Sequence, residues 1–161
     1  MSEIIVQKFG GTSVGSVERI DAVAEIVKNA SQSNKIVVVV SAMAGETNKL
    51  VNLAKNFSEN PNKREFDALV ATGETISSAL LAMALHSKGL KAKSYSASQI
   101  SMRTTDSFSK ARILDMDSSK ILQTIDPLKI MTMSPMYVSK SATTQKFRDS
   151  KISIISTQAT F

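Results

Sequence analysis

The sequence lacks several side chains on which common enzyme classes depend. Among its 161 residues there is no cysteine, no tryptophan and a single histidine, His86. Without cysteine this stretch of chain can form no disulfide, no thiolate nucleophile and no Cys-ligated metal centre, which fits a cytoplasmic protein. One histidine cannot supply a histidine cluster for a metal. We therefore expect no metal-ligating residues, and we expect His86, late in a helical stretch, to be structural.

Long hydrophobic runs are also missing. Unbroken apolar stretches such as IVVVV at residues 36–40 are far shorter than the roughly 20 residues that a membrane-spanning helix needs. The N-terminal residues MSEIIVQK include an early acid and no basic segment before an apolar core, so we do not expect a secretory signal. The sequence predicts a protein that contacts no membrane.

Glycine, glutamate and negative charge are scarce in the second half. No glycine follows Gly89 and no glutamate follows Glu74. Residues 1–74 carry eight Lys/Arg and nine Asp/Glu, whereas residues 75–161 carry twelve Lys/Arg and five Asp. A basic half can indicate phosphate or nucleic-acid partners, or simply a solvated surface. The only tyrosines, Tyr95 and Tyr137, are far apart, which argues against base stacking, so we expect no nucleic acid.

The first hundred residues alternate between two kinds of segment. Strand-like stretches cover residues 3–9, 35–43 and 92–98, and helix-like stretches cover residues 16–30, 48–57 and 64–89. Ser16 is a candidate N-cap, and the third helix is interrupted at Thr72-Gly73. The β-branched run in the second strand is typical of a strand buried on both faces. This order predicts an α/β fold with three α/β/α layers and a mainly parallel sheet.

A glycine turn follows the first strand. The stretch KFGGTSVG at residues 8–15 is neither G-x-G-x-x-G nor G-x-x-x-x-G-K-[ST]. It nevertheless has the parts of an anion cradle, because Gly10 and Gly11 let backbone N–H groups turn inward, a helix begins next, and Lys8 adds positive charge. The alternative is that the glycines merely permit a tight turn.

Two further polar clusters are candidates for the same site. SAMAGETN at residues 41–48 follows the second strand, and the carboxyl ends of parallel strands share one edge where ligands bind. There Thr47 and Asn48 could bind a ligand or cap the next helix. Glu74 lies in an apolar helical stretch, where a buried carboxylate needs a cation or hydrogen-bond donors. That partner could be a ligand ammonium or Lys8, or Glu74 could be exposed.

These motifs resemble one known family. KFGGTSVGSVERI, VVVVSAMAGETNKLVNLA and KREFDALVATGETISSALLAMAL are similar to the opening motifs of aspartate kinases, in the amino acid kinase superfamily. TTDSFSKARILDMD resembles the stretch that follows, and the resemblance spans about residues 3–126. It implies Mg²⁺-dependent transfer of the γ-phosphoryl of ATP to the side-chain carboxylate of L-aspartate. The product, 4-phospho-L-aspartate, begins lysine, threonine and methionine biosynthesis. It also implies a cytoplasmic homo-oligomer.

The resemblance assigns roles to nine residues. It implies that Lys8 is catalytic and neutralises phosphate charge in the transition state. It implies two sets of contacts: Lys8, Phe9, Gly10, Gly11, Thr12 and Ser13 with ATP, and Ser41, Thr47 and Glu74 with aspartate. Glu74 would hold the α-ammonium group. No residue is assigned to a metal.

The sequence departs from the family pattern after residue 126. An aspartate kinase should continue with a glycine-rich loop, the nucleotide-base half of the domain and two regulatory ACT domains. We therefore predict the N-terminal part of an amino acid kinase domain at residues 1–126, a divergent tail unrelated to the family at residues 127–161, and no ACT domain. The alternative to a truncated kinase is a non-catalytic fragment that folds partially or associates with a full-length homologue.

Overall fold

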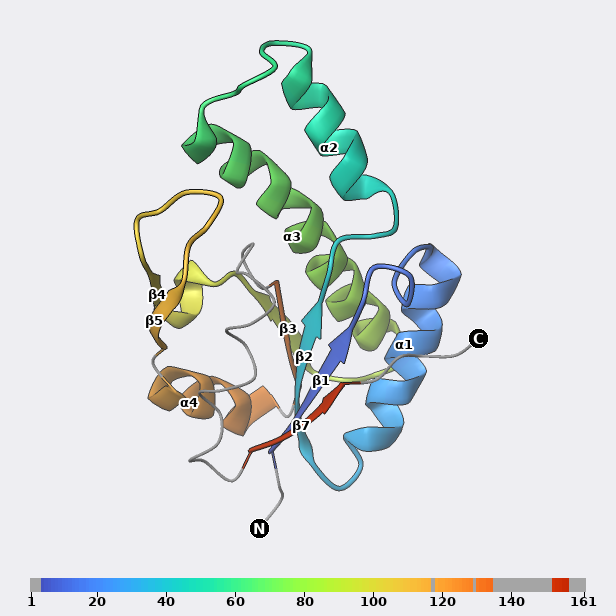
Figure 1. Ribbon diagram of the computed structural model, residues 1–161. Coiled ribbons are helices and arrows are strands. Elements are labelled where there is room, and N and C mark those ends of the chain that lie inside the picture. The colour runs from blue at the N-terminus through green and yellow to red at the C-terminus, as the bar shows by residue number, and fades with distance from the viewer. Residues whose placement is uncertain (1–3, 117, 129, 135–151, 157–161) are drawn as a thin grey trace.

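A five-stranded parallel sheet organises the computed structural model, which describes residues 4–116, 118–128, 130–134 and 152–156. The strand order is β3 (Ala92–Tyr95), β6 (Ile130–Met133), β2 (Lys35–Val40), β1 (Ile4–Phe9) and β7 (Ile152–Ser156). Every neighbouring pair in this sheet is parallel. Helices lie on both faces (Figure 1). The predicted α/β/α architecture with a mainly parallel sheet is confirmed.

Each face of the sheet has its own core. Ile36, Val38 and Val40 of β2 pack with α1 (Val17–Ala30) and α3 (Lys63–Ser87). Val37 and Val39 of the same strand pack with α4 (Ser118–Leu128) on the other face. Successive side chains of a strand point to opposite faces. The uninterrupted β-branched run therefore serves two cores at once, as the sequence predicted.

Helix starts were predicted with mixed success. Ser16 caps α1 by accepting a hydrogen bond from Arg19 N at 3.3 Å, as predicted. The alternative that Thr47 or Asn48 caps the next helix is wrong, because α2 (Glu46–Lys55) has Gly45 at its N-cap with φ 82°. Glycine is the residue that adopts this left-handed conformation at little cost.

Helix α3 runs unbroken for 25 residues. The predicted interruption at Thr72-Gly73 is wrong, and Gly73 is a buried helical residue. By length and composition α3 could cross a membrane, with a mean hydropathy of 1.5 and 39% of that window buried. Its buried residues include Leu81 and Leu85, which belong to the core beneath it. Packing on the sheet therefore accounts for its apolar inner face.

Residues 97–116 form an irregular excursion beside the sheet. The 3-10 turn η1 (Ser98–Ile100) leads into an antiparallel hairpin of β4 (Met102–Thr104) and β5 (Ile113–Met116). Ser101 and Ser109 adopt positive φ values of 55° and 64°. These serines occupy left-handed positions where glycine is the usual residue. The glycine-free region is thus still able to turn.

The predicted boundary at residue 126 does not coincide with the end of a structural element. Helix α4 continues to Leu128, and β6 pairs with both β2 and β3 inside the sheet. Thr132 of β6 is fully buried, and its hydroxyl bonds to the Ser78 carbonyl at 3.0 Å. The end of the predicted tail, residues 157–161, lies outside the described residues, as do residues 135–151.

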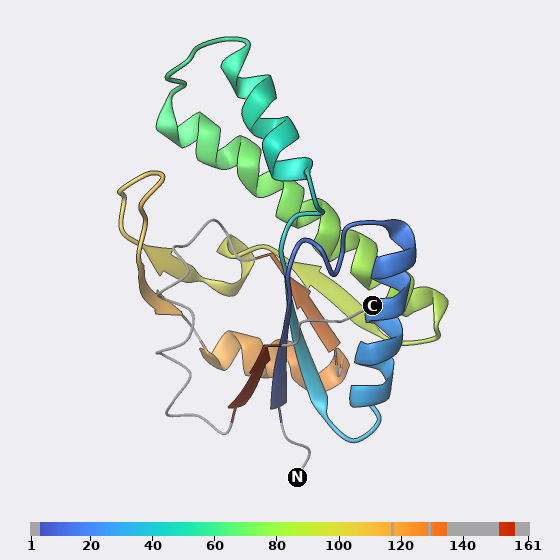
Figure 2. The ribbon, with the colours of Figure 1, turned by 45° about the vertical axis from the view of Figure 1, so that its right-hand side comes forward.

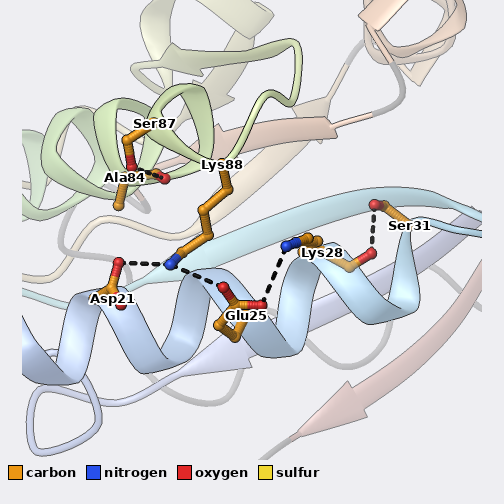
Figure 3. Close-up of polar contacts among 7 residues, drawn as sticks. All are labelled: Asp21, Glu25, Lys28, Ser31, Ala84, Ser87 and Lys88. Atoms are coloured by element: carbon orange, nitrogen blue, oxygen red, sulfur yellow. Dashed lines mark hydrogen bonds and ion pairs between the residues drawn. The ribbon is translucent and has the colours of Figure 1, made fainter.

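An ion-pair cluster ties the end of α3 to α1 (Figure 3). Lys88 Nζ lies 2.7 Å from Asp21 Oδ1 and 3.0 Å from Glu25 Oε1. Lys28 adds a longer contact to Glu25 at 3.6 Å. The hydrogen bond from Lys88 holds the pKa of Glu25 below its ordinary value, and the bonds to Asp21 and Glu25 raise the pKa of Lys88.

Replacing Lys88 with glutamine should lower the melting temperature at pH 7 by roughly 1–4 °C, because ion pairs with acids that are about half exposed contribute little. Since the pKa of Glu25 is lowered on folding, this stabilisation is present above the ordinary pKa of 4.5 and is lost as the pH falls through the lowered value. Thermal melts across this pH range should show that the difference in melting temperature between wild type and Lys88→Gln becomes smaller as the pH falls. Lys28→Gln is the matched control, and an equal loss in both variants would contradict the central role of Lys88.

Candidate functional site

Three glycines from two motifs pack against one loop. A Cβ on Gly11 would lie 2.7 Å from the Ala42 carbonyl oxygen, and a Cβ on Gly73 would lie 3.1 Å from Ala42 Cβ. A Cβ on Gly15 would lie 3.2 Å from Ala44 Cβ. The loop after β2 is therefore enclosed by the turn after β1 and by α3. The structure brings the three predicted motifs together at the carboxyl edge of the sheet, where Figure 2 shows these segments meeting.

The glycine turn is shaped by hydrogen bonds of its own backbone. Ser13 N donates to the Gly10 carbonyl at 2.9 Å, so this amide is used within the turn. Arg19 Nη1 donates to the Thr12 carbonyl at 2.8 Å and braces the loop from the first turn of α1. Gly10 is exposed, and a Cβ built on it would meet nothing within 4 Å. Space for a ligand therefore lies beside Gly10 rather than beside Gly11.

Not all of the predicted ATP-contacting residues have side chains that are exposed at the surface. Lys8 and Thr12 are exposed, whereas Phe9 and Ser13 are buried, with exposed fractions of 0% and 4%. Phe9 belongs to the core between the sheet, α1 and α3. Its carbonyl accepts a hydrogen bond from Ser41 N at 3.1 Å, which links the ends of β1 and β2. Phe9 and Ser13 can thus contribute to the site only by positioning its backbone.

The loop after β2 places the remaining predicted residues near α3. Ser41 and Thr47 are half-buried, and Thr47 lies in the first turn of α2. Glu46, just before it, has its Cγ 3.6 Å from the position of a Cβ on Gly73. Glu46 Oε1 also lies 3.4 Å from Lys49 Nζ. The sequence did not single out Glu46, because an acid in the first turn of a helix is common on exposed surfaces.

Glu74 is the most perturbed titratable group described. Burial raises its pKa to about 8, although the positive charge of Lys8 acts in the opposite direction. No described residue donates a hydrogen bond to its buried Oε2 atom. A carboxylate that lacks a donor in a low-dielectric site is costly, and a cationic ligand would relieve that cost. The charge of Lys8 acts on Glu74, so the two residues lie near enough to interact electrostatically.

Arg19 is a site residue that the sequence did not reveal. Its spacing in SVERI fits the exposed face of α1, and only the structure shows that its side chain reaches back to Thr12. Gly73 gave a signal, but a glycine in a helix can indicate either a break or a close approach. Within the described residues, no group of three or more His, Asp or Glu side chains could hold a metal ion.

Comparison with known proteins gives the family. The chain matches the amino acid kinase family over residues 3–156, and it belongs to that family. The match passes the predicted boundary at residue 126. It is 51% identical over 132 residues to an aspartate kinase of Stutzerimonas stutzeri, covering 81% of this chain and 32% of the relative. It is 52% identical over 124 residues to an aspartokinase of Geobacillus stearothermophilus, covering 76% and 30%.

Solved structures agree with this assignment. An aspartate kinase from Synechocystis superposes with a TM-score of 0.69 at 42% identity, covering 81% of this chain and 21% of that one. Aspartokinase III of E. coli, solved with aspartate and ADP, superposes with a TM-score of 0.69 at 24% identity, covering 85% and 41%. The latter likeness supports the fold alone. The chain spans about a third of the length of the curated relatives it matches.

The glycine contacts predict opposite outcomes at neighbouring positions. Gly11→Ala should destabilise the protein by roughly 1–3 kcal/mol, because its methyl group would overlap a backbone carbonyl that cannot rotate away. Gly10→Ala should change stability by less than about 0.5 kcal/mol, since its methyl group meets open space. Urea unfolding of both variants measures the difference, and equal stabilities would contradict the close approach of the two loops.

Glu74 predicts a pH-dependent gain in stability on substitution. The unfolded chain ionises Glu74 above its ordinary pKa of 4.5, whereas the folded chain keeps the proton until about pH 8. The folded state binds more protons in this window, so Glu74 lowers stability as the pH rises. Glu74→Gln should therefore be more stable by roughly 1–3 kcal/mol at pH 8 and by much less at pH 5. Melts of Glu65→Gln, exposed on the same helix, provide the control; an equal pH-dependent gain there would refute the assignment.

Proposed function

We propose that this chain is the N-terminal part of the catalytic domain of an aspartate kinase. The reaction is transfer of the γ-phosphoryl of ATP to the side-chain carboxylate of L-aspartate, giving 4-phospho-L-aspartate and ADP. One observation carries the proposal: a buried carboxylate, Glu74, lacks a described donor and shares an edge of the sheet with Lys8 and the glycine turn. The identity of about half to aspartate kinases supports the same substrate.

The proposed roles follow from charge and burial. The exposed Lys8 would neutralise charge on the transferring phosphoryl group, and the open space beside Gly10 would admit the phosphates. Phosphoryl transfer needs positioning and charge neutralisation more than a covalent group. Glu74 would bind the α-ammonium of aspartate, which supplies the cation that its carboxylate lacks. Ser41 and Thr47 would add hydrogen bonds to the acceptor.

Mg²⁺ would reach this site with the nucleotide. Mg²⁺ is usually held by one or two carboxylates together with substrate phosphates. The described residues offer no acidic cluster, so the phosphates of ATP would supply most of the ligands of the ion, and the ion would neutralise their charge. We further propose a cytoplasmic homo-oligomer, in keeping with the absence of cysteine and with the family resemblance.

A hydroxamate assay dependent on ATP and L-aspartate tests the proposal. Lys8→Ala should reduce kcat by about 10²–10³-fold, and Glu74→Gln should raise the KM for aspartate with little change in the KM for ATP. Because the pKa of Glu74 is about 8 in the free protein, its carboxylate is ionised above that pH. Aspartate should therefore bind more tightly as the pH rises from 6 to 8 in wild type but not in Glu74→Gln.

The second candidate is a non-catalytic fragment that associates with a full-length homologue. The chain spans about a third of the length of its curated relatives. Absence of turnover by this chain alone, together with its assembly with a full-length aspartate kinase on mixing, would support this second candidate. Glu65→Gln is the matched control for Glu74→Gln in the assay, since both replace a glutamate of α3.

A further inference from the structure

A two-point clasp joins the loop of the β4–β5 hairpin to α3. Ser109 N donates to Asp67 Oδ2 at 2.6 Å, and the Ser109 hydroxyl donates to Asp67 Oδ1 at 3.1 Å. Both carboxylate oxygens are therefore used by one residue that lies 42 positions away in the sequence. Ser109 makes these bonds with a φ of 64°, a left-handed conformation that is uncommon for serine. Hydrogen bonds to a charged acceptor are among the stronger ones.

The clasp lies on the same side of α3 as Glu74. Asp67 and Glu74 are seven residues apart, which places them on one helix face about 10 Å apart along the axis. One turn further on, Ser78 bonds to Thr132 of β6 at 3.3 Å, so this face looks toward the sheet. Both ribbon views show the hairpin loop beside the first half of α3 (Figures 1 and 2). The loop thus flanks the region that Glu74 faces.

The hairpin loop is basic, and this charge suits the carboxylate groups of the acceptor amino acid. Residues 105–112 contain two cations, Lys110 and Arg112, and one acid, Asp106. An amino dicarboxylate whose ammonium lies at Glu74 still has two carboxylates to neutralise. Aspartate itself spans only about 5 Å, so a basic segment anchored about 10 Å from Glu74 along the helix can meet it through the length of the Lys110 and Arg112 side chains.

We propose, on the basis of the proposed function, that Asp67 is a positioning residue for the acceptor. Its clasp on Ser109 holds residues 105–112 as one wall of the amino acid site. The clasp therefore sets the affinity for aspartate and leaves the nucleotide side, which is formed by the turn after β1, unaffected. A purely structural contact would instead alter stability, or both substrates alike.

Steady-state kinetics of the whole chain separate these possibilities. Asp67→Ala and Ser109→Ala should each raise the KM for L-aspartate by about tenfold, the equivalent of losing one charge-assisted hydrogen bond, with the KM for ATP within about twofold of wild type. Asp67→Asn should recover part of the loss, because its amide oxygen can still accept one bond. Glu65→Ala, which removes another exposed acid from the first half of α3 without touching residues 105–112, is the matched control and should resemble wild type.

Hydrogen exchange gives a second readout that does not need turnover. L-Aspartate should protect residues 70–78 and residues 105–112 in wild type, and only residues 70–78 in Asp67→Ala. Protection of residues 70–78 without the hairpin in wild type, or an unchanged KM for aspartate in Asp67→Ala, overturns this inference while the proposed function stands. If wild type shows neither turnover nor any protection by L-aspartate, the proposed function fails and the inference falls with it.

Discussion

The close approach of the loop after β2 to three glycines is the constraint on which the candidate site depends. The Ala42 carbonyl lies where a side chain at position 11 would begin, and Ala42 Cβ contacts Gly73 in the middle of α3. Any side chain at these positions would push apart the turn after β1 and the helix that carries Glu74. The glycines therefore matter less for their flexibility than for the absence of a Cβ, and only one turn-forming glycine of the site, Gly45, has a positive φ.

The close packing of the loop after β2 against α3 also explains the raised pKa of Glu74. Enclosing α3 against the loop buries the carboxylate, and the charge of Lys8 offsets this burial only in part, because the pKa still rises to about 8. A native protein has only about 5–15 kcal/mol of stability to draw on, so a cost of a few kcal/mol at one side chain is large. Such costs are usually retained where function needs them. An ionised Glu74 is best accommodated when a cationic ligand is present.

The sequence predicted the elements that local sequence patterns determine. It failed where packing against a segment distant in sequence determines the structure. The β-branched run of β2 and the Ser16 cap are local patterns, and both were confirmed. Gly73 was misread as a helix break, because its reason for being glycine is the approach of Ala42, a residue distant in sequence. The fully buried position of Phe9 and the reach of Arg19 to Thr12 likewise depend on packing that periodicity does not encode.

The part of the chain beyond residue 126 shows how far the site depends on distant segments. In the described sheet, β3 pairs only with β6, and β6 alone connects it to β2. All four residues of β6 are buried, and Thr132 bonds to Ser78, one turn of α3 after Glu74. Whatever the origin of residues 127–161, without β6 the described sheet would end at β2 and α3 would lose a hydrogen-bonded support close to Glu74. The support of α3 close to Glu74 therefore rests on residues that the sequence motifs did not include.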